Sequence, residues 1–202
     1  MKVREIDSRV TDVLQGAFGH DERSTGLHSS QIWEDLDRQV NTKNRTPLEL
    51  AKLEEYGTIG FMWERVLENV LAQLTVDSNP HRYFRPGEQF LDGIYLTPDY
   101  FDADFLGDES CLTGVEEWKV RWCSVNKGDD LEKNFWKILV QIKAYCRVLE
   151  TTRARLRILF IVGNWRDDIT PKLRTWELEF TEREIVDNWS MLVGHARRKK
   201  WL

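Results

Sequence analysis

The chain has 202 residues, of which 41% are hydrophobic and 31% charged, a balance typical of a globular protein. It contains no apolar run long enough to cross a membrane and no apolar signal core at its start, so we expect a cytoplasmic, non-membrane protein. Three scattered cysteines without a CxxC pair argue against a disulfide framework, and they are too few for a four-cysteine metal site.

The net charge of −5 does not by itself indicate a nucleic-acid partner, but the charges are unevenly distributed. Residues 1–118 hold 11 basic and 23 acidic side chains, whereas residues 119–157 hold 10 basic and 4 acidic ones. The chain then closes with "ARRKKWL". This asymmetry indicates a basic surface that faces an anion, although a solvated helix face gives the same pattern.

Two helices are predicted in the N-terminal part of the chain. The stretch "SSQIWEDLDRQV" is typical of a helix capped by Ser29 or Ser30. A longer helix begins after Thr46, with Pro47 at its first position and apolar residues at helical spacing as far as Leu74.

A hairpin and an α-β-β-α series follow. Alternation predicts one strand over residues 88–104, "FLGDES" a hairpin loop, and "TGVEEWKVRW" a second strand. A helix capped by Asp129 or Asp130 comes next, then a buried strand over 155–165 and a short strand over 175–180. Thr181 and Glu184 fit the capping box of a final helix.

The strand "TGVEEWKVRW" separates its side chains into two faces, because residues two apart point the same way. One face carries Val115, Glu117, Lys119 and Arg121, and the other carries Glu116, Trp118, Val120 and Trp122. We expect the second face to pack against the core. The pair Glu117 and Lys119 is then either a surface ion pair or part of a metal site.

Pairing of the two hairpin strands would bring Asp99 next to Glu117, with Lys119 alongside. Two close carboxylates both stay ionised only if a cation lies between them, and hard oxygen ligands suit Mg²⁺ or Mn²⁺. A neighbouring lysine can orient or deprotonate a water molecule and stabilise developing negative charge.

These residues resemble the motif of the PD-(D/E)XK nuclease superfamily: Pro98-Asp99, followed by Glu117-Trp118-Lys119. "GFMWE" places Glu64 on a helix before the hairpin, as in the RecB-like and lambda-exonuclease-like branches. "QIKAY" resembles the QxxxY motif of those branches, with Gln141 and Tyr145 on one side of the helix that follows. The four elements occur in the expected order, and the resemblance covers roughly residues 55–165.

The resemblance implies a role for each residue of the motif. Asp99, Glu117 and the Trp118 carbonyl would bind Mg²⁺ or Mn²⁺, and Glu64 would complete the metal shell directly or through water. Lys119 would position the attacking water. Gln141 and Tyr145 would organise the pocket or hold a DNA phosphate.

The sequence leaves alternatives for some of these roles. Asp92 is a rival acid that lacks the preceding proline, and Glu68 lies one helical turn from Glu64 and could share its role. Gln141 and Tyr145 could instead serve only helix packing.

Further nucleic-acid contacts are expected from the same resemblance. The basic stretch after Lys119, with Arg121 and Lys137, would face the phosphate backbone. His28 could touch DNA or the site, although a structural role is the simpler reading. Arg197 and Arg198 in the C-terminal cluster either grip phosphates or belong to a solvated tail.

The predicted fold is a single α/β domain over residues 1–202, a restriction-endonuclease-like core with a central mixed sheet flanked by helices in α-β-β-α-β order. The core spans about 45–165, with an N-terminal helical segment 1–44 and a C-terminal strand and helix 166–202. The predicted activity is Mg²⁺-dependent DNA hydrolysis, with exonuclease action on DNA ends first. The alternatives are a structure-specific endonuclease and a non-catalytic DNA-binding or assembly module.

The resemblance also suggests biological surroundings. Processive action by one small domain would need a homo-oligomer or a recombination or packaging partner. A phage-encoded protein with a role in DNA recombination or repair fits the branch.

Overall fold

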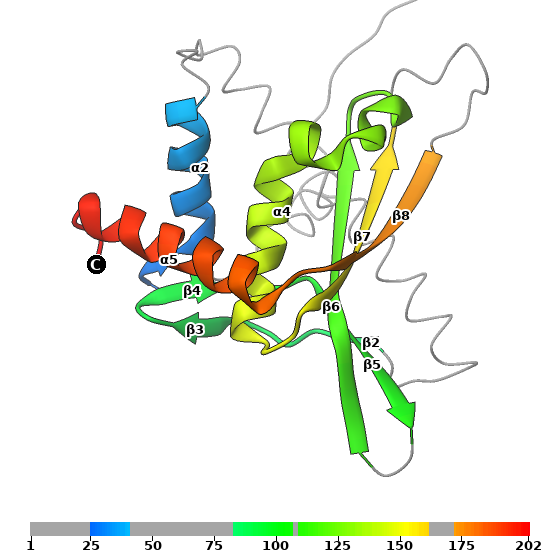
Figure 1. The fold of residues 1–202 in the computed structure, drawn as a ribbon, viewed down its shortest axis with the longest axis horizontal. Coiled ribbons are helices and arrows are strands. Elements are labelled where there is room, and N and C mark those ends of the chain that lie inside the picture. The colour runs from blue at the N-terminus through cyan, green and yellow to red at the C-terminus, as the bar shows by residue number, and fades with distance from the viewer. Residues whose placement is uncertain (1–24, 41–82, 107–108, 162–171) are drawn as a thin grey trace, which may run out of the picture.

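A five-stranded mixed sheet is the main element of the computed structural model, which describes residues 25–40, 83–106, 109–161 and 172–202 (Figure 1). Its strand order is β2-β5-β6-β7-β8. These strands are β2 Tyr83–Phe84, β5 Tyr100–Leu106, β6 Glu109–Arg121, β7 Arg153–Phe160 and β8 Lys172–Glu179. The pair β6–β7 is parallel and the other neighbours are antiparallel, so the predicted mixed sheet is confirmed.

The helices of the described chain pack beside one another, and α4 lies against the sheet (Figure 1). They are α2 Ser29–Val40, α4 Leu131–Val148 and α5 Glu182–Arg198, with a short 3-10 helix η1 Val125–Asp129 after β6. Helix α4 connects the parallel strands β6 and β7, as a crossover must. The order β5, β6, α4, β7 is the one predicted for a restriction-endonuclease-like core.

Helices α4 and α5 begin at their predicted caps, but α2 does not. The Asp130 side chain accepts a hydrogen bond from the Lys133 backbone N–H at 3.0 Å and starts α4. Thr181 and Glu184 form a reciprocal capping box at the start of α5. Ser29 and Ser30 lie inside the first turn of α2 rather than before it.

The single strand predicted over residues 88–104 is wrong, because the chain turns back on itself there. Asp92 and Gly93 have φ angles of 49° and 86°, and this tight turn joins the short strands β3 Gln89–Leu91 and β4 Ile94–Leu96. With β1 Leu27–His28 they form a separate three-stranded sheet of order β1-β4-β3. The main-sheet strand β5 begins only after Pro98 and Asp99.

The face of β6 that packs on the core is the opposite of the predicted one. Val115 and Glu117 are buried on the side that α4 covers, and the buried Ala154 and Leu156 of β7 pair with them. Trp122, which we expected in the core, is 40% exposed. The hydrophobic cluster therefore extends beneath α4, on the face that carries the ExK residues.

The predicted long helix after Thr46, with Glu64 and Glu68, lies outside the described residues. None of the helices that the structure describes is both long enough and apolar enough to cross a membrane.

Candidate active site

The β5–β6 hairpin places Asp99 beside the ExK segment. Tyr100 pairs with Glu116 in the antiparallel register, so Asp99 at the mouth of the hairpin lies level with Glu117. The Trp118 backbone N–H donates a hydrogen bond to Asp99 Oδ2 at 3.1 Å. The predicted meeting of Asp99 with Glu117 and Lys119 is thus present in the structure.

Three oxygen-bearing groups surround the Lys119 ammonium. Its Nζ forms an ion pair with the fully buried Glu117 carboxylate and lies 3.5 Å from Asp99 Oδ2. It also donates a hydrogen bond to the Trp118 carbonyl oxygen at 3.2 Å. Two carboxylates and one carbonyl therefore converge on a single positive charge.

This set of donors fits a divalent cation. A buried carboxylate is costly unless a positive charge compensates it, and the Lys119 ammonium marks the point where such a charge is stabilised. Carboxylate and carbonyl oxygens are the ligands that Mg²⁺ and Mn²⁺ prefer. In the described part of the chain, no group of three or more His, Cys, Asp and Glu side chains gathers at one point, and the third predicted acid, Glu64, lies outside that part.

Gln141 and Tyr145 on α4 form a hydrogen-bonded pair on the core side of β6. Gln141 Nε2 donates to the Tyr145 hydroxyl at 2.8 Å, and Tyr145 is buried. Burial raises the pKa of the Tyr145 hydroxyl well above its usual range, and the charges of Glu117 and Asp99 raise it further against weaker opposing effects. The hydroxyl therefore keeps its proton near the two carboxylates.

Arg121 ends β6 two residues beyond Lys119, on the same face and half-buried. Burial lowers the pKa of its guanidinium, and the nearby Cys123 and Glu117 partly offset this effect. Lys137 lies on α4 one helical turn before Gln141.

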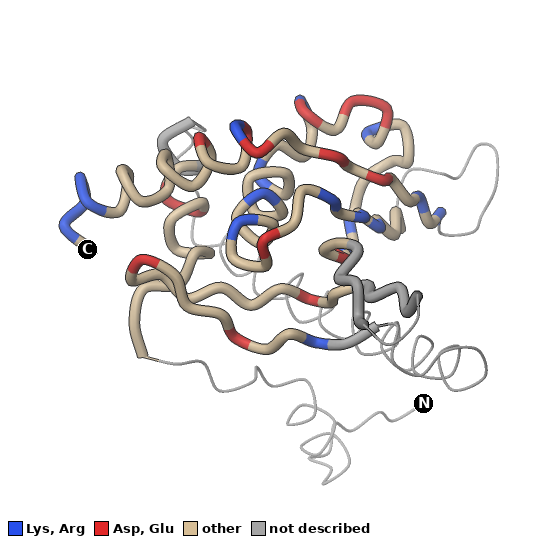
Figure 2. Tube along the Cα trace, turned by 60° about the horizontal axis from the view of Figure 1, so that its bottom comes forward, with Lys and Arg blue, Asp and Glu red and all other residues tan. Residues whose placement is uncertain are grey.

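The other predicted nucleic-acid contacts lie elsewhere in the fold. The His28 ring stacks on Tyr95 at 5.4 Å between ring centroids, and its Nδ1 lies 3.7 Å from Glu88. Arg197 and Arg198 are exposed at the end of α5, in the basic terminus of the tube in Figure 2. Their roles in DNA contact stay predictions.

The rival acid Asp92 has a structural partner. It lies in the β3–β4 turn, and its Oδ2 accepts a hydrogen bond from the Trp189 indole at 2.7 Å. This contact ties the small sheet to α5, and it gives Asp92 a role that needs no metal.

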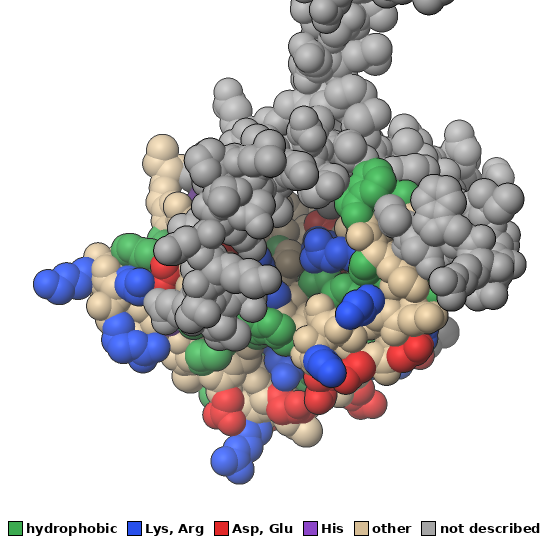
Figure 3. Space-filling view, turned by 90° about the horizontal axis from the view of Figure 1, so that it is seen from above, with side chains coloured by type: hydrophobic (Ala, Val, Ile, Leu, Met, Phe, Trp, Pro, Cys, Tyr) green, Lys and Arg blue, Asp and Glu red, His purple; other side chains and the backbone are tan. Residues whose placement is uncertain are grey.

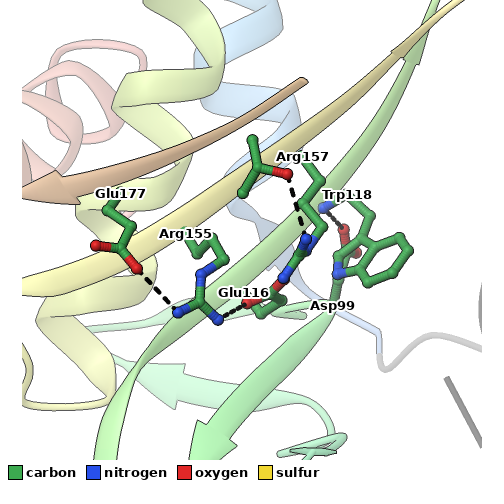
Figure 4. Close-up of polar contacts among 7 residues, drawn as sticks. Asp99, Glu116, Trp118, Arg155, Arg157 and Glu177 are labelled. Atoms are coloured by element: carbon green, nitrogen blue, oxygen red, sulfur yellow. Dashed lines mark hydrogen bonds and ion pairs between the residues drawn. The ribbon is translucent and has the colours of Figure 1, made fainter. Parts of the chain in front are cut away.

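Sequence reasoning placed Glu116 on the opposite face of β6 but missed the charged network that surrounds it (Figure 4). Glu116 is fully buried and forms ion pairs with Arg155, at 3.2 Å, and with Arg157. Arg155 continues to Glu177 at 3.1 Å. The alternating arginines of "RARLRILF" are the sequence feature that predicts this network. A buried strand that carries cations on every second residue needs anions on the same face.

The Trp118 side chain belongs to this opposite face. The Arg157 guanidinium lies over its ring at 5.5 Å, and the Tyr100 ring is 6.3 Å away. The Trp118 backbone, by contrast, contacts Asp99 and Lys119. Trp118 thus links the charged network around Glu116, here called the outer network, to the carboxylate–lysine cluster of Asp99, Glu117 and Lys119. Its indole does not cover that cluster.

Comparison with known proteins gives only distant overlaps. No family model and no curated protein matches the chain. Solved structures that overlap with it include SSO0001, with a TM-score of 0.49 and 13% identity, covering 92% of this chain and 83% of that one. An alkaline exonuclease from Laribacter hongkongensis overlaps with a TM-score of 0.48 and 10% identity, covering 86% of this chain and 87% of that one. A phage-related exonuclease from Haemophilus somnus overlaps with a TM-score of 0.44 and 11% identity, covering 84% of this chain and 79% of that one. Scores of this size describe only a partial overlap of folds.

Proposed function

We propose that this protein is a Mg²⁺-dependent deoxyribonuclease that hydrolyses phosphodiester bonds at the cluster of Asp99, Glu117 and Lys119. The observation that carries the proposal is the convergence of both carboxylates and the Trp118 carbonyl on one positive charge, at hairpin positions that match the PD-(D/E)XK motif. A chance surface ion pair does not bury its carboxylate completely, as Glu117 is buried.

Asp99, Glu117 and the Trp118 carbonyl would hold the metal ion, with Glu64 as a further ligand. When bound, the ion would supply Lewis-acid polarisation of the phosphate and lower the pKa of a nearby water. Lys119 would hydrogen-bond the attacking water and stabilise the negative charge that develops on the phosphate. The neutral Tyr145 hydroxyl would donate a hydrogen bond to a phosphate oxygen, because Gln141 donates to its oxygen and leaves the O–H free to do so.

Within this class, exonuclease action on linear duplex ends is our first proposal, and it rests on the branch resemblance of the motifs. One domain of this size cannot enclose a duplex, so processive degradation would require a second copy of the chain or a recombination protein.

The test is cleavage of end-labelled linear and circular duplex DNA in Mg²⁺, Mn²⁺ or EDTA. Metal-dependent loss of linear DNA alone, abolished in Lys119→Ala and Asp99→Ala, would support an exonuclease at this site. The control is Glu182→Gln, which removes an exposed carboxylate from the first turn of α5 and should cleave like the wild type.

Other outcomes favour other functions. Cleavage of circles as well as linear DNA would identify an endonuclease. DNA binding without cleavage in any metal would overturn the catalytic proposal and favour a DNA-binding module. Activity that survives in both Lys119→Ala and Asp99→Ala would place catalysis elsewhere in the chain.

A further inference from the structure

Arg121 is an unusual cation for its position in the fold. Its side chain is half-buried at the carboxyl end of β6, and no carboxylate forms an ion pair with it among the residues the structure describes. A partly desolvated guanidinium without a bound anion is costly, so proteins rarely keep one unless it binds something. The Glu117 charge compensates this burial only in part, so an anionic ligand would further stabilise the guanidinium.

The end of β6 concentrates further positive charge. Lys127 is exposed in the last turn of η1. Burial raises the pKa of the Cys123 thiol, and the charges of Arg121 and Lys127 both act to lower it, so both cations lie near this thiol. For Lys127 too, the described residues provide no carboxylate partner. Viewed from the end where β6 and β7 finish, several basic side chains gather near the middle of this surface (Figure 3).

The basic side chains along β6 follow one another in a row, as contacts to a polyanionic strand that passes the active site would. Lys119 and Arg121 point to the same side of β6 and are separated by one two-residue step, about 6.6 Å along the strand. Asp99 and Glu117 lie at one end of this row, Lys119 in the middle, and Arg121 with Lys127 at the other end. The row thus leads from the carboxylates of Asp99 and Glu117, which suit a cation, to Arg121 and Lys127, which suit an anion.

We infer that Arg121 and Lys127 form a phosphate-binding subsite for the nucleic-acid strand being cut, next to the carboxylate–lysine cluster. The subsite binds a backbone phosphate adjacent to the one that is hydrolysed. The cut strand therefore runs along β6 from Glu117 toward η1. This inference rests on the proposed nuclease function for its ligand, but its test measures binding rather than cleavage.

Arginine suits this role because its planar fork donates two hydrogen bonds to one phosphate, whereas Lys127 adds a point charge at the exposed rim. Within the one parallel pair of the described sheet, β6–β7, Arg121 lies at the carboxyl end of β6, the end at which open α/β sheets bind their ligands.

The experiment is the salt dependence of binding to a fluorescent duplex, measured by anisotropy in EDTA so that no cleavage occurs. Each phosphate contact contributes about 0.9 to the slope of log K against log salt. In Arg121→Gln the slope should become shallower by about 0.9, and the affinity should fall about tenfold at 0.1 M salt. The control Arg147→Gln removes an exposed cation from the last turn of α4 and should leave the slope unchanged.

Two further variants keep the test decisive if Arg121→Gln unfolds. Arg121→Lys keeps the charge and should retain the slope, with weaker binding from the lost second hydrogen bond. Lys127→Gln changes an exposed side chain and should lower the slope without affecting the melting temperature. An unchanged slope in Lys127→Gln and in every folded Arg121→Gln sample would overturn the subsite.

The two proposals fail in different ways. If the wild type binds DNA with the predicted slope changes but cleaves nothing in Mg²⁺ or Mn²⁺, the subsite stands and the nuclease function falls. If the wild type cleaves DNA but Lys127→Gln and folded Arg121→Gln both keep the wild-type slope, the nuclease function stands and the subsite falls. A wild type that binds no DNA would overturn both.

Discussion

Gln141 donates a hydrogen bond to the hydroxyl oxygen of Tyr145 at 2.8 Å, and this fixes which way the phenolic proton can point. Because the Gln141 amide donates to a lone pair of this oxygen, the phenolic O–H must donate to an acceptor other than Gln141. The charges of Glu117 and Asp99 act on the same hydroxyl. The pair therefore presents a donor, not an acceptor, to the candidate site.

Removing that donor should slow hydrolysis more than it affects folding. In Tyr145→Phe we expect kcat to fall by about two to three orders of magnitude, the range seen when one donor to a developing negative charge is lost. The melting temperature should change little, because the ring and its packing against Trp33 remain. The measurement is steady-state cleavage with a thermal scan, and Tyr95→Phe is the matched control. A Tyr145→Phe enzyme with full kcat would limit Tyr145 to helix packing.

The Glu117–Lys119 pair should be strongly coupled in the absence of metal. Lys119→Met leaves the fully buried Glu117 carboxylate without its ammonium and should cost about 3–5 kcal/mol of unfolding free energy. Adding Glu117→Gln should recover part of that loss, because the buried charge is then gone. Urea denaturation in EDTA of both single variants and the double variant gives the coupling energy. Additive losses would show that the two groups do not interact.

Divalent metal should stabilise the folded protein through the same carboxylates. Mg²⁺ or Mn²⁺ at 100 times its Kd should add about 2.7 kcal/mol to the unfolding free energy of the wild type. Asp99→Asn should lose most of this increase while it folds normally in EDTA, since one ligand charge is removed. Thermal scans across a metal titration measure the effect. An equal metal-dependent shift in Asp99→Asn would place the binding site away from Asp99.

Local signals in the sequence predicted the starts of helices α4 and α5 and the hairpin register, whereas the error on β6 is non-local. The caps at Asp130 and Thr181 and the Asp99–Glu117 meeting were predictable because each depends on nearby residues or on one hairpin register. The buried face of β6 was not. Both of its faces mix charge with apolar bulk, and the choice depends on α4 and on the pairing with β7.

The strand predicted over residues 88–104 failed for a local reason, because its Asp-Gly dipeptide forms a hairpin turn. Its alternation continues through Asp92 and Gly93, but the positive φ angles there fold β4 back on β3. Alternation of side chains alone does not reveal such a turn. Glu64 lies outside the described residues, so its role as a metal ligand stays a prediction.

In the outer network, the buried carboxylate of Glu116 should contribute much to stability and the exposed carboxylate of Glu177 should contribute little. Glu116→Ala leaves Arg155 and Arg157 without their shared buried carboxylate and should cost about 3–5 kcal/mol. Glu177→Gln removes only the exposed partner of Arg155 and should cost less than about 1 kcal/mol. Urea denaturation compares the two variants. Equal losses would contradict the difference in burial.

Alkaline conditions should destabilise the protein through Cys146. Burial raises the pKa of this thiol from 9.0 to about 12, so the folded state keeps a proton that the unfolded chain releases. A folded pKa above the unfolded value means that this contribution is complete below pH 9.0 and is lost as the pH rises toward 12. Cys146→Ala should therefore show a shallower loss of stability with pH over that window. Urea denaturation of both proteins at matched pH values measures the difference, and parallel pH profiles would show that the thiol ionises equally in both states.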